Sequence, residues 1–164
     1  MKQYILCAVL PLLSFFLFCS QILADDSSHT TNLKRCVNEK IGFRIKCSKD
    51  WDIKPMPQVV FFVISKQPRV VVTIDKSKTS KTLDELNIPK INPFGKTSRS
   101  MVDGQEAIRT DIDTPWGDHM LDLYVIKDSY LYTINFTVNP GSQWKDYSPI
   151  FEEMISSFQF LEKS

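Results

Sequence analysis

The chain has 164 residues, carries 20 lysines and arginines against 19 aspartates and glutamates, and has a formal net charge of +1. A near-neutral chain lacks the clustered cations that neutralise nucleic-acid phosphates, so its composition argues against nucleic-acid binding. Hydrophobic residues make up 43% and aromatic residues 12% of the chain, which fits a folded protein and argues against a disordered one.

The first residues have the pattern of a secretory signal peptide. Lys2 supplies a positive start, residues 4–18 are almost wholly apolar, and the small residue Ala24 stands just before two aspartates. This order of charge, apolar core and small exit residue favours cleavage after Ala24. Two alternatives stay open: an uncleaved anchor over residues 5–24, and lipidation of Cys19.

Cleavage at this point defines the domain organisation. Residues 1–24 are the signal peptide, the polar residues 25–33 are a flexible leader, and residues 34–164 form one domain. The remaining chain of about 140 residues is large enough for one hydrophobic core and too small for two. We expect an exported protein, periplasmic or extracellular, with no stable membrane insertion once the signal is removed.

Two of the four cysteines, Cys36 and Cys47, lie in the expected mature chain. An exported chain with two cysteines suggests one disulfide. A hairpin with a two-residue turn at Ile41 and Gly42 pairs positions that sum to 83, so it sets Cys36 directly opposite Cys47, within disulfide reach. The bond should contribute roughly 2–3 kcal/mol. The alternative, a redox-active pair, favours a Cys-x-x-Cys spacing.

The first half of the domain reads as strands followed by a polar loop. Residues 59–64 and 69–75 are two apolar β runs without polar alternation, which predicts that both faces of the sheet are covered there. Residues 76–81 (KSKTSK) are expected to form a mobile basic loop. Thr82 and Glu85 have capping-box spacing and predict a short helix over residues 82–87. Residues 88–96, with two prolines and a glycine, are expected to be loop.

The second half reads as an antiparallel meander closed by a helix. Strands are expected over residues 98–102, 105–114 and 118–127, with a tight turn at residues 128–129 before a fourth strand. That turn sets three apolar pairs opposite one another: Val125 with Tyr132, Leu123 with Ile134, and Leu121 with Phe136. An apolar stripe at helical spacing then predicts an amphipathic closing helix; its members are Trp144, Tyr147, Phe151, Met154 and Phe158.

These elements resemble the PsbP-like domain family in three stretches. They are Ile41-Gly42-Phe43-x-Ile45 followed by Asp50-Trp51, then Val102-Asp103-Gly104-Gln105-Glu106-Ala107, and the closing Trp144-x-x-Tyr147-x-x-x-Phe151-x-x-Met154-x-x-Ser157-Phe158. The resemblance spans about residues 40–160 and extends to the wider group of PsbP, DcrB-like and Ran-binding Mog proteins. It implies an α+β fold, an antiparallel sheet of about six strands packed between helices. It also implies binding or assembly modules without catalysis.

The chemistry-bearing residues form no recognisable catalytic set. The only histidines are His29 and His119, and no nucleophile triad, phosphate loop or zinc spacing is present. A loop over residues 114–117 predicts that Asp113 faces Asp118 and that Arg109 faces Asp122, while His119 has the opposite parity. Two interpretations of the aspartates remain open: a solvated edge that deters aggregation, or an oxygen-only cation site. The candidate metal ligands are Asp111, Asp113 and Asp118.

A second set of candidates is basic or aromatic. Lys76, Lys78 and Lys81 would contact an acidic partner or lipid headgroups, and Trp116 would contact a partner from its turn; solvated loops are the alternative. The sequence therefore favours a non-enzymatic binding or assembly-support module of the cell envelope, without a cofactor, whose partner is an envelope protein or complex. The alternative is a small-ligand or divalent-cation binder that uses the acidic sheet edge.

Overall fold

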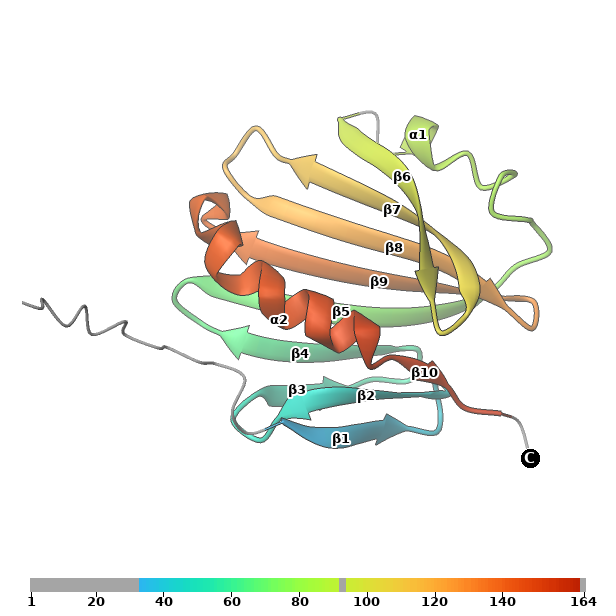
Figure 1. Ribbon diagram of the computed structural model, residues 1–164, viewed down its shortest axis with the longest axis horizontal. Helices are drawn as coiled ribbons and strands as arrows, with labels where there is room; N and C mark the ends of the chain where they lie inside the picture. Colours follow the sequence, from blue (N-terminus) through green and yellow to red (C-terminus); the bar gives the residue numbers. More distant parts are fainter. Residues whose placement is uncertain (1–32, 92–93, 163–164) are drawn as a thin grey trace, which may run out of the picture.

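The computed structural model describes residues 33–91 and 94–162 (Figure 1). The expected signal peptide and almost all of the expected leader lie outside these residues. The described chain forms two antiparallel sheets. In spatial order, the small sheet contains β1 (Leu33–Asn38), β2 (Phe43–Ser48) and β10 (Gln159–Phe160). The large sheet contains β3 (Asp52–Pro55), β4 (Val59–Ser65), β5 (Arg69–Lys78), β9 (Tyr130–Asn139), β8 (His119–Lys127), β7 (Gln105–Asp113) and β6 (Gly95–Val102).

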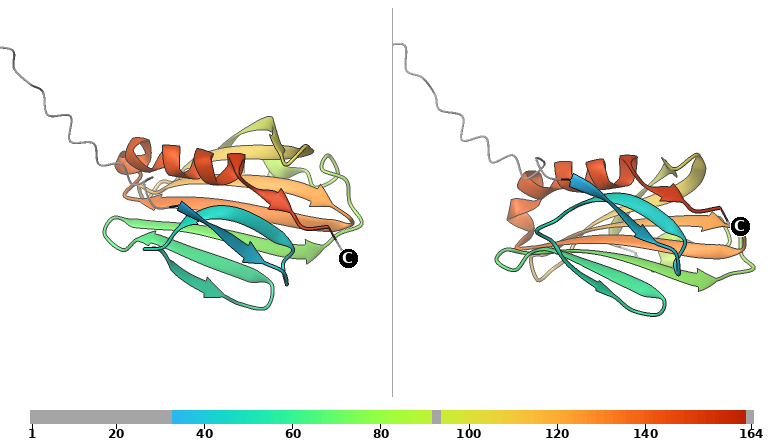
Figure 2. Two further views of the ribbon diagram at one scale, coloured as in Figure 1. Left: turned by 60° about the horizontal axis from the view of Figure 1, so that its bottom comes forward. Right: turned by 90° about the horizontal axis from the view of Figure 1, so that it is seen from below.

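The helical elements are α1 (Ile88–Ile91), the 3-10 turn η1 (Gly141–Gln143) and α2 (Trp144–Ser156). The α+β class with an antiparallel sheet is confirmed, although the large sheet has seven strands where about six were expected. Helix α2 and the small sheet lie on the same side of the large sheet (Figure 2). No helix in the described residues is long and apolar enough to cross a membrane.

The closing helix forms where its apolar stripe predicts, and it packs on the centre of the large sheet. Phe151 stacks on Phe136 of β9, with ring centroids 4.9 Å apart. Phe158, just after the helix, stacks on Phe43 of β2 at 5.4 Å. One buried cluster therefore joins both sheets and the helix. Pro149 lies inside α2, beyond its first turn.

The predicted register of β8 and β9 is confirmed. Leu121 pairs with Phe136, Leu123 with Ile134, and Val125 with Tyr132. The connecting residues 128 and 129 have positive φ values of 52° and 62°, as a tight two-residue hairpin turn requires. Local turn geometry and the apolar pattern agree here, so the register is fixed by both.

The register of the first hairpin differs from the prediction. Residues 39–42 form a four-residue connection, closed by the Gly42 N–H donating to the Asn38 carbonyl at 2.8 Å. The residue numbers of each cross-strand pair therefore sum to 81 instead of 83, and Cys36 lies opposite Ile45 instead of Cys47. The cysteines are diagonal neighbours with Cα atoms 5.9 Å apart, joined as a disulfide. This separation is ordinary for a disulfide, because diagonal positions on one face remain within its reach.

The register of β7 and β8 also differs from the prediction, in this case by one residue. The loop covers residues 114–118, so Asp113 pairs with His119 and Thr110 with Asp122. The expected facing of Arg109 with Asp122 is wrong, because a shift of one residue exchanges the two faces of a strand. Asp122 is instead buried on the face away from α2, where it accepts hydrogen bonds from Tyr124 at 2.9 Å and Asn135 at 2.5 Å.

The segment after residue 75 is more ordered than its composition suggests. Strand β5 continues to Lys78, so Lys76 is not part of a mobile loop. Thr82 and Glu85 do exchange capping-box hydrogen bonds, but residues 83–86 form only a turn. Asn87 has a φ of 50°, which ends the turn. Helix α1 then begins at Ile88 and β6 at Gly95, in a region expected to be loop.

The two faces of the large sheet are covered unequally. On the face away from α2, the turn at 83–86 and α1 cover the part of the sheet that carries Ile108, Tyr124 and Leu131, and there Ile88, Ile108 and Tyr124 form a small second cluster. Over β4 and β5 the same face is only half-buried. The expectation that both faces of these two strands are covered is therefore wrong, and an apolar surface remains accessible there.

Candidate functional site

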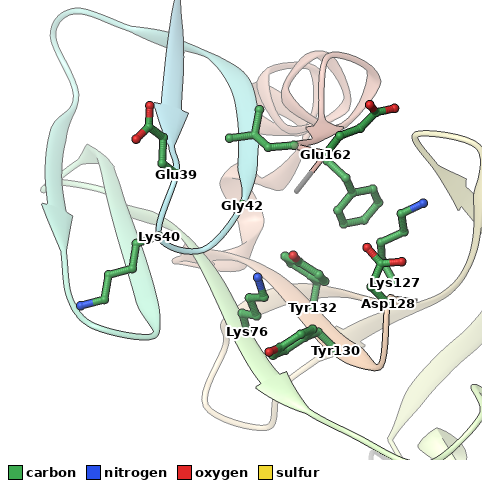
Figure 3. Close-up of a pocket in the computed structure, with 11 residues that line it drawn as sticks. Glu39, Lys40, Gly42, Lys76, Lys127, Asp128, Tyr130, Tyr132 and Glu162 are labelled. Carbon is green, nitrogen blue, oxygen red and sulfur yellow. The ribbon is translucent and has the colours of Figure 1, made fainter. Parts of the chain in front are cut away.

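A pocket of about 770 Å³ lies where four segments meet on the small-sheet side of the molecule (Figure 3). The segments are the β1–β2 turn, the end of β5, the β8–β9 hairpin, and the chain around β10. The pocket is thus assembled from both ends of the domain. Lys76, Tyr130, Tyr132 and Phe160 line it together with two further lysines, Lys40 and Lys127, and three acids, Glu39, Asp128 and Glu162.

Lys76 lies at the centre of this pocket together with two tyrosines (Figure 3). Its Nζ donates a hydrogen bond to the Ile41 carbonyl at 2.7 Å. The same atom lies 4.5 Å from the ring centroid of Tyr130 and 5.3 Å from that of Tyr132. The Tyr132 hydroxyl donates to the same Ile41 carbonyl at 3.0 Å. One carbonyl acceptor and two aromatic rings therefore hold the ammonium in place.

Strand pairing explains why these residues meet. Lys76 lies directly opposite Tyr132 in the β5–β9 ladder, and Tyr130 lies two residues before Tyr132 on β9. Phe160 packs its ring edge-on against Tyr132, with centroids 4.9 Å apart. The strand ladder and the chain around β10 therefore place one cation among three aromatic rings.

Gly42 allows the β1–β2 turn to approach this group closely. Its φ is +88°, a conformation that glycine adopts without steric cost. A Cβ atom here would lie 3.4 Å from both the Lys76 Nζ and the Tyr132 hydroxyl. The turn thus brings the Ile41 carbonyl onto the lysine without a side chain between them.

The charge of Lys76 is not matched by a carboxylate. The half-buried ammonium makes no ion pair within the described residues, and its one hydrogen bond there is to a neutral carbonyl. An ammonium has three N–H donors, so two remain for a ligand. At the rim, Lys40 points away from the tyrosines (Figure 3). The arrangement suits an anionic group attached to an apolar or aromatic body.

The structure separates the basic and aromatic residues that the sequence singled out. Lys76 lines the pocket, whereas Lys78 and Lys81 are exposed and are not among its lining residues. Trp116 lies in the β7–β8 loop, is 74% exposed, and donates from its indole nitrogen to Asp118 at 3.0 Å. Tyr130 and Phe160 were not predicted as site residues, and Tyr132 was predicted only as a core residue.

The three aspartates proposed as metal ligands have separate partners. Asp111 accepts from Arg109 at 3.1 Å, and Asp118 accepts from Trp116. Asp113 lies 2.7 Å from Nδ1 of His119. Within the described residues, no three or more metal-ligating side chains are grouped to hold an ion.

Arg109 and His119 are the partners of two of these aspartates, Asp111 and Asp113. Burial lowers the pKa of Arg109, but hydrogen bonds to Asp111 and Glu152 outweigh burial and raise that pKa overall. The expected opposite parity of His119 and Asp113 is wrong, because they are cross-strand partners. The His119 ring also packs on Trp144, with centroids 3.9 Å apart. These contacts give the edge a structural role.

Comparison with known proteins relates the chain by fold. No protein-family model and no curated protein sequence matches it. Among solved structures, cyanobacterial PsbP (CyanoP) from Synechocystis sp. PCC 6803 is 18% identical with a TM-score of 0.59, covering 82% of this chain and 95% of its own. LpqN of Mycobacterium tuberculosis, described as involved in cell envelope biogenesis, is 9% identical with a TM-score of 0.54, covering 80% and 91%.

A third solved structure comes from Bacteroides thetaiotaomicron VPI-5482. It is 13% identical with a TM-score of 0.56 and covers 81% of this chain but 50% of its own. In all three comparisons the likeness extends over at least 80% of this chain. At sequence identities this low, the likeness shows the fold alone, so the function has to be argued from the residues of this chain.

Proposed function

We propose that this chain, which has the PsbP-like fold, works as an exported, non-enzymatic binding module of the cell envelope that holds an anionic group of its partner at Lys76. The signal-peptide pattern and the joined cysteines support export into an oxidising compartment. The fold shared with CyanoP and LpqN is compatible with an envelope role.

One observation carries this proposal: the unmatched charge of Lys76. Placing an ammonium among aromatic rings and away from water costs free energy unless an opposite charge or good hydrogen bonds compensate. Here the Ile41 carbonyl and the rings of Tyr130 and Tyr132 compensate only in part. A carboxylate or phosphate of a partner would supply the missing charge and use the two remaining N–H donors.

The test is in-cell crosslinking of the tagged, exported protein, followed by mass spectrometry of the captured proteins. We compare the wild-type chain with Lys76→Met and with Lys78→Met. Lys78 is a matched control, because it lies two residues away on the same strand but outside the pocket lining. We expect a dominant envelope protein whose capture falls at least about tenfold in Lys76→Met, as for the loss of a charged contact, and is unchanged in Lys78→Met.

Equal capture by both variants would contradict the proposal, as would capture of the chain's own copies alone. Thermal melting of the purified variants shows that each is folded. Lys76→Met should lose about 1 kcal/mol or less of unfolding free energy, since it removes one hydrogen bond to a neutral acceptor.

A further inference from the structure

A second surface lies on the opposite face of the large sheet, away from α2. Strands β3, β4 and β5 form a shallow groove there of about 420 Å³. Its floor comes from alternating residues that point away from the main core: Phe61 and Val63 on β4 and Val71 on β5. Because successive side chains of a strand point to opposite faces, this groove is separate from the Lys76 pocket.

The floor is apolar and accessible. Phe61, Val63 and Val71 are each only partly buried, although Val60, Phe62 and Val72 on the other face are almost fully buried. Met56 at one side is 52% exposed. No helix or strand of the described chain covers this part of the sheet (Figure 2). Accessible apolar side chains grouped in this way mark an interaction surface.

The rim of the groove is basic. Lys54, Lys66 and Arg69 are exposed around the apolar floor, against one acid, Asp52. Asp52 is already paired with Lys54, with the nitrogen and oxygen 3.3 Å apart. Neither Lys66 nor Arg69 forms an ion pair in the described part of the chain. Two cations at one end of an apolar groove are thus available to an acidic partner.

We propose that this groove binds an acidic peptide segment of a partner protein, with an apolar side chain on the floor and carboxylates on Lys66 and Arg69. The charge complementarity of the rim selects the acidic residues. A volume of about 420 Å³ accommodates a few side chains, in the range of ordinary binding pockets. An extended segment also matches the strand direction that spaces these residues.

Two other occupants fit the groove less well. An anionic bilayer requires apolar side chains that protrude beyond the basic ones, whereas Phe61, Val63 and Val71 are recessed on the floor and the cations stand at the rim. A second copy of this chain would bring the same groove, whose single acid, Asp52, is already paired with Lys54, so it supplies no unpaired carboxylate for Lys66 and Arg69.

The experiment selects peptides of about ten residues from a random displayed library on the full exported protein, since strand-like recognition needs segments of this length. We expect the selected peptides to carry aspartate or glutamate beside leucine, isoleucine or phenylalanine. Lys66→Glu with Arg69→Glu should weaken their binding at least about tenfold, and Val71→Thr several-fold, because rim charge and floor contact both contribute.

The control is Lys34→Glu with Arg35→Glu, which makes the same change of net charge on β1 of the small sheet. It should bind the selected peptides as the wild-type chain does. Selected peptides without acidic residues, or equal binding by the two double variants, would overturn the proposal. Loss of all selection in the wild-type chain, or binding of phosphatidylglycerol vesicles in place of peptides, would also overturn it.

Discussion

Gly42 links backbone conformation to the binding pocket at the scale of one residue. It has a φ of +88°, and Gly104 in the β6–β7 turn has a φ of +72°, but a Cβ atom at Gly104 would meet nothing within 4 Å. The two glycines therefore share the same backbone strain on substitution and differ in what the added methyl group contacts. Because the backbone strain is shared and only the surroundings differ, Gly104 is a matched control for Gly42.

We predict that Gly104→Ala lowers the free energy of unfolding by about 1 kcal/mol, through the positive φ alone. Gly42→Ala should cost more, about 2 kcal/mol, because its methyl group also contacts the Lys76 ammonium and the Tyr132 hydroxyl and screens both from water. Urea unfolding measures both values. If Gly42→Ala cost no more than Gly104→Ala, the close packing of the β1–β2 turn on Lys76 would be contradicted.

The disulfide acts at the scale of the β1–β2 hairpin. It joins an outer strand, β1, to β2, and Cys47 is fully buried. We predict that the exported protein has two hydrogens less in intact mass than its reduced form, and that reduction lowers the free energy of unfolding by roughly 2–3 kcal/mol. The oxidised and reduced samples have the same sequence, so each is the control for the other. Two alkylatable thiols in the oxidised sample would contradict the bond.

Elements with a strong internal pattern could be predicted from the sequence, and turns of ambiguous length could not. Helix α2 follows from its apolar spacing, and the β8–β9 pairing follows because residues 128 and 129 admit only a tight turn. Two other hairpins, β1–β2 and β7–β8, were misregistered, because Gly42 and Gly117 fit turns of more than one length. A difference of one residue at Gly117 moved His119 to the face of Asp113.

The site was predictable only in part, for a related reason. Lys76 was singled out for its charge but assigned to a loop, because KSKTSK has no apolar residue to mark a strand. Its cross-strand partner Tyr132 has the pattern of a core residue. The contribution of Phe160 depends on a strand of two residues that pairs with β2. No local pattern predicts such a distant contact.

At the scale of the whole molecule, the two sheets share one buried cluster through the closing helix. Phe158 stacks on Phe43 of the small sheet and meets Phe160 at 5.0 Å, and Phe160 in turn meets Tyr132 of the large sheet at 4.9 Å. A shared core implies that the described domain unfolds as a unit.

We predict that Phe158→Ala lowers the free energy of unfolding by about 3–5 kcal/mol, as for other buried aromatic residues, while unfolding stays a single transition. Circular dichroism follows the sheets, and tryptophan fluorescence follows Trp51 and Trp144 over a signal from the exposed Trp116. Met101→Ala, at a 56% exposed position, is the control and should change stability little. Two separated transitions in the wild-type chain would show that the sheets are independent.

The late strand β10 gives the pocket a further property. The Leu161 N–H donates to the Gly42 carbonyl at 3.0 Å. Two walls of the pocket therefore come from segments that lie more than one hundred residues apart in the sequence. A chain shortened before Gln159 would keep the large sheet but lack that wall. Only a chain folded through to β10 would then capture a partner at Lys76. A bulky fusion placed directly after Glu162 would obstruct the entrance of the pocket.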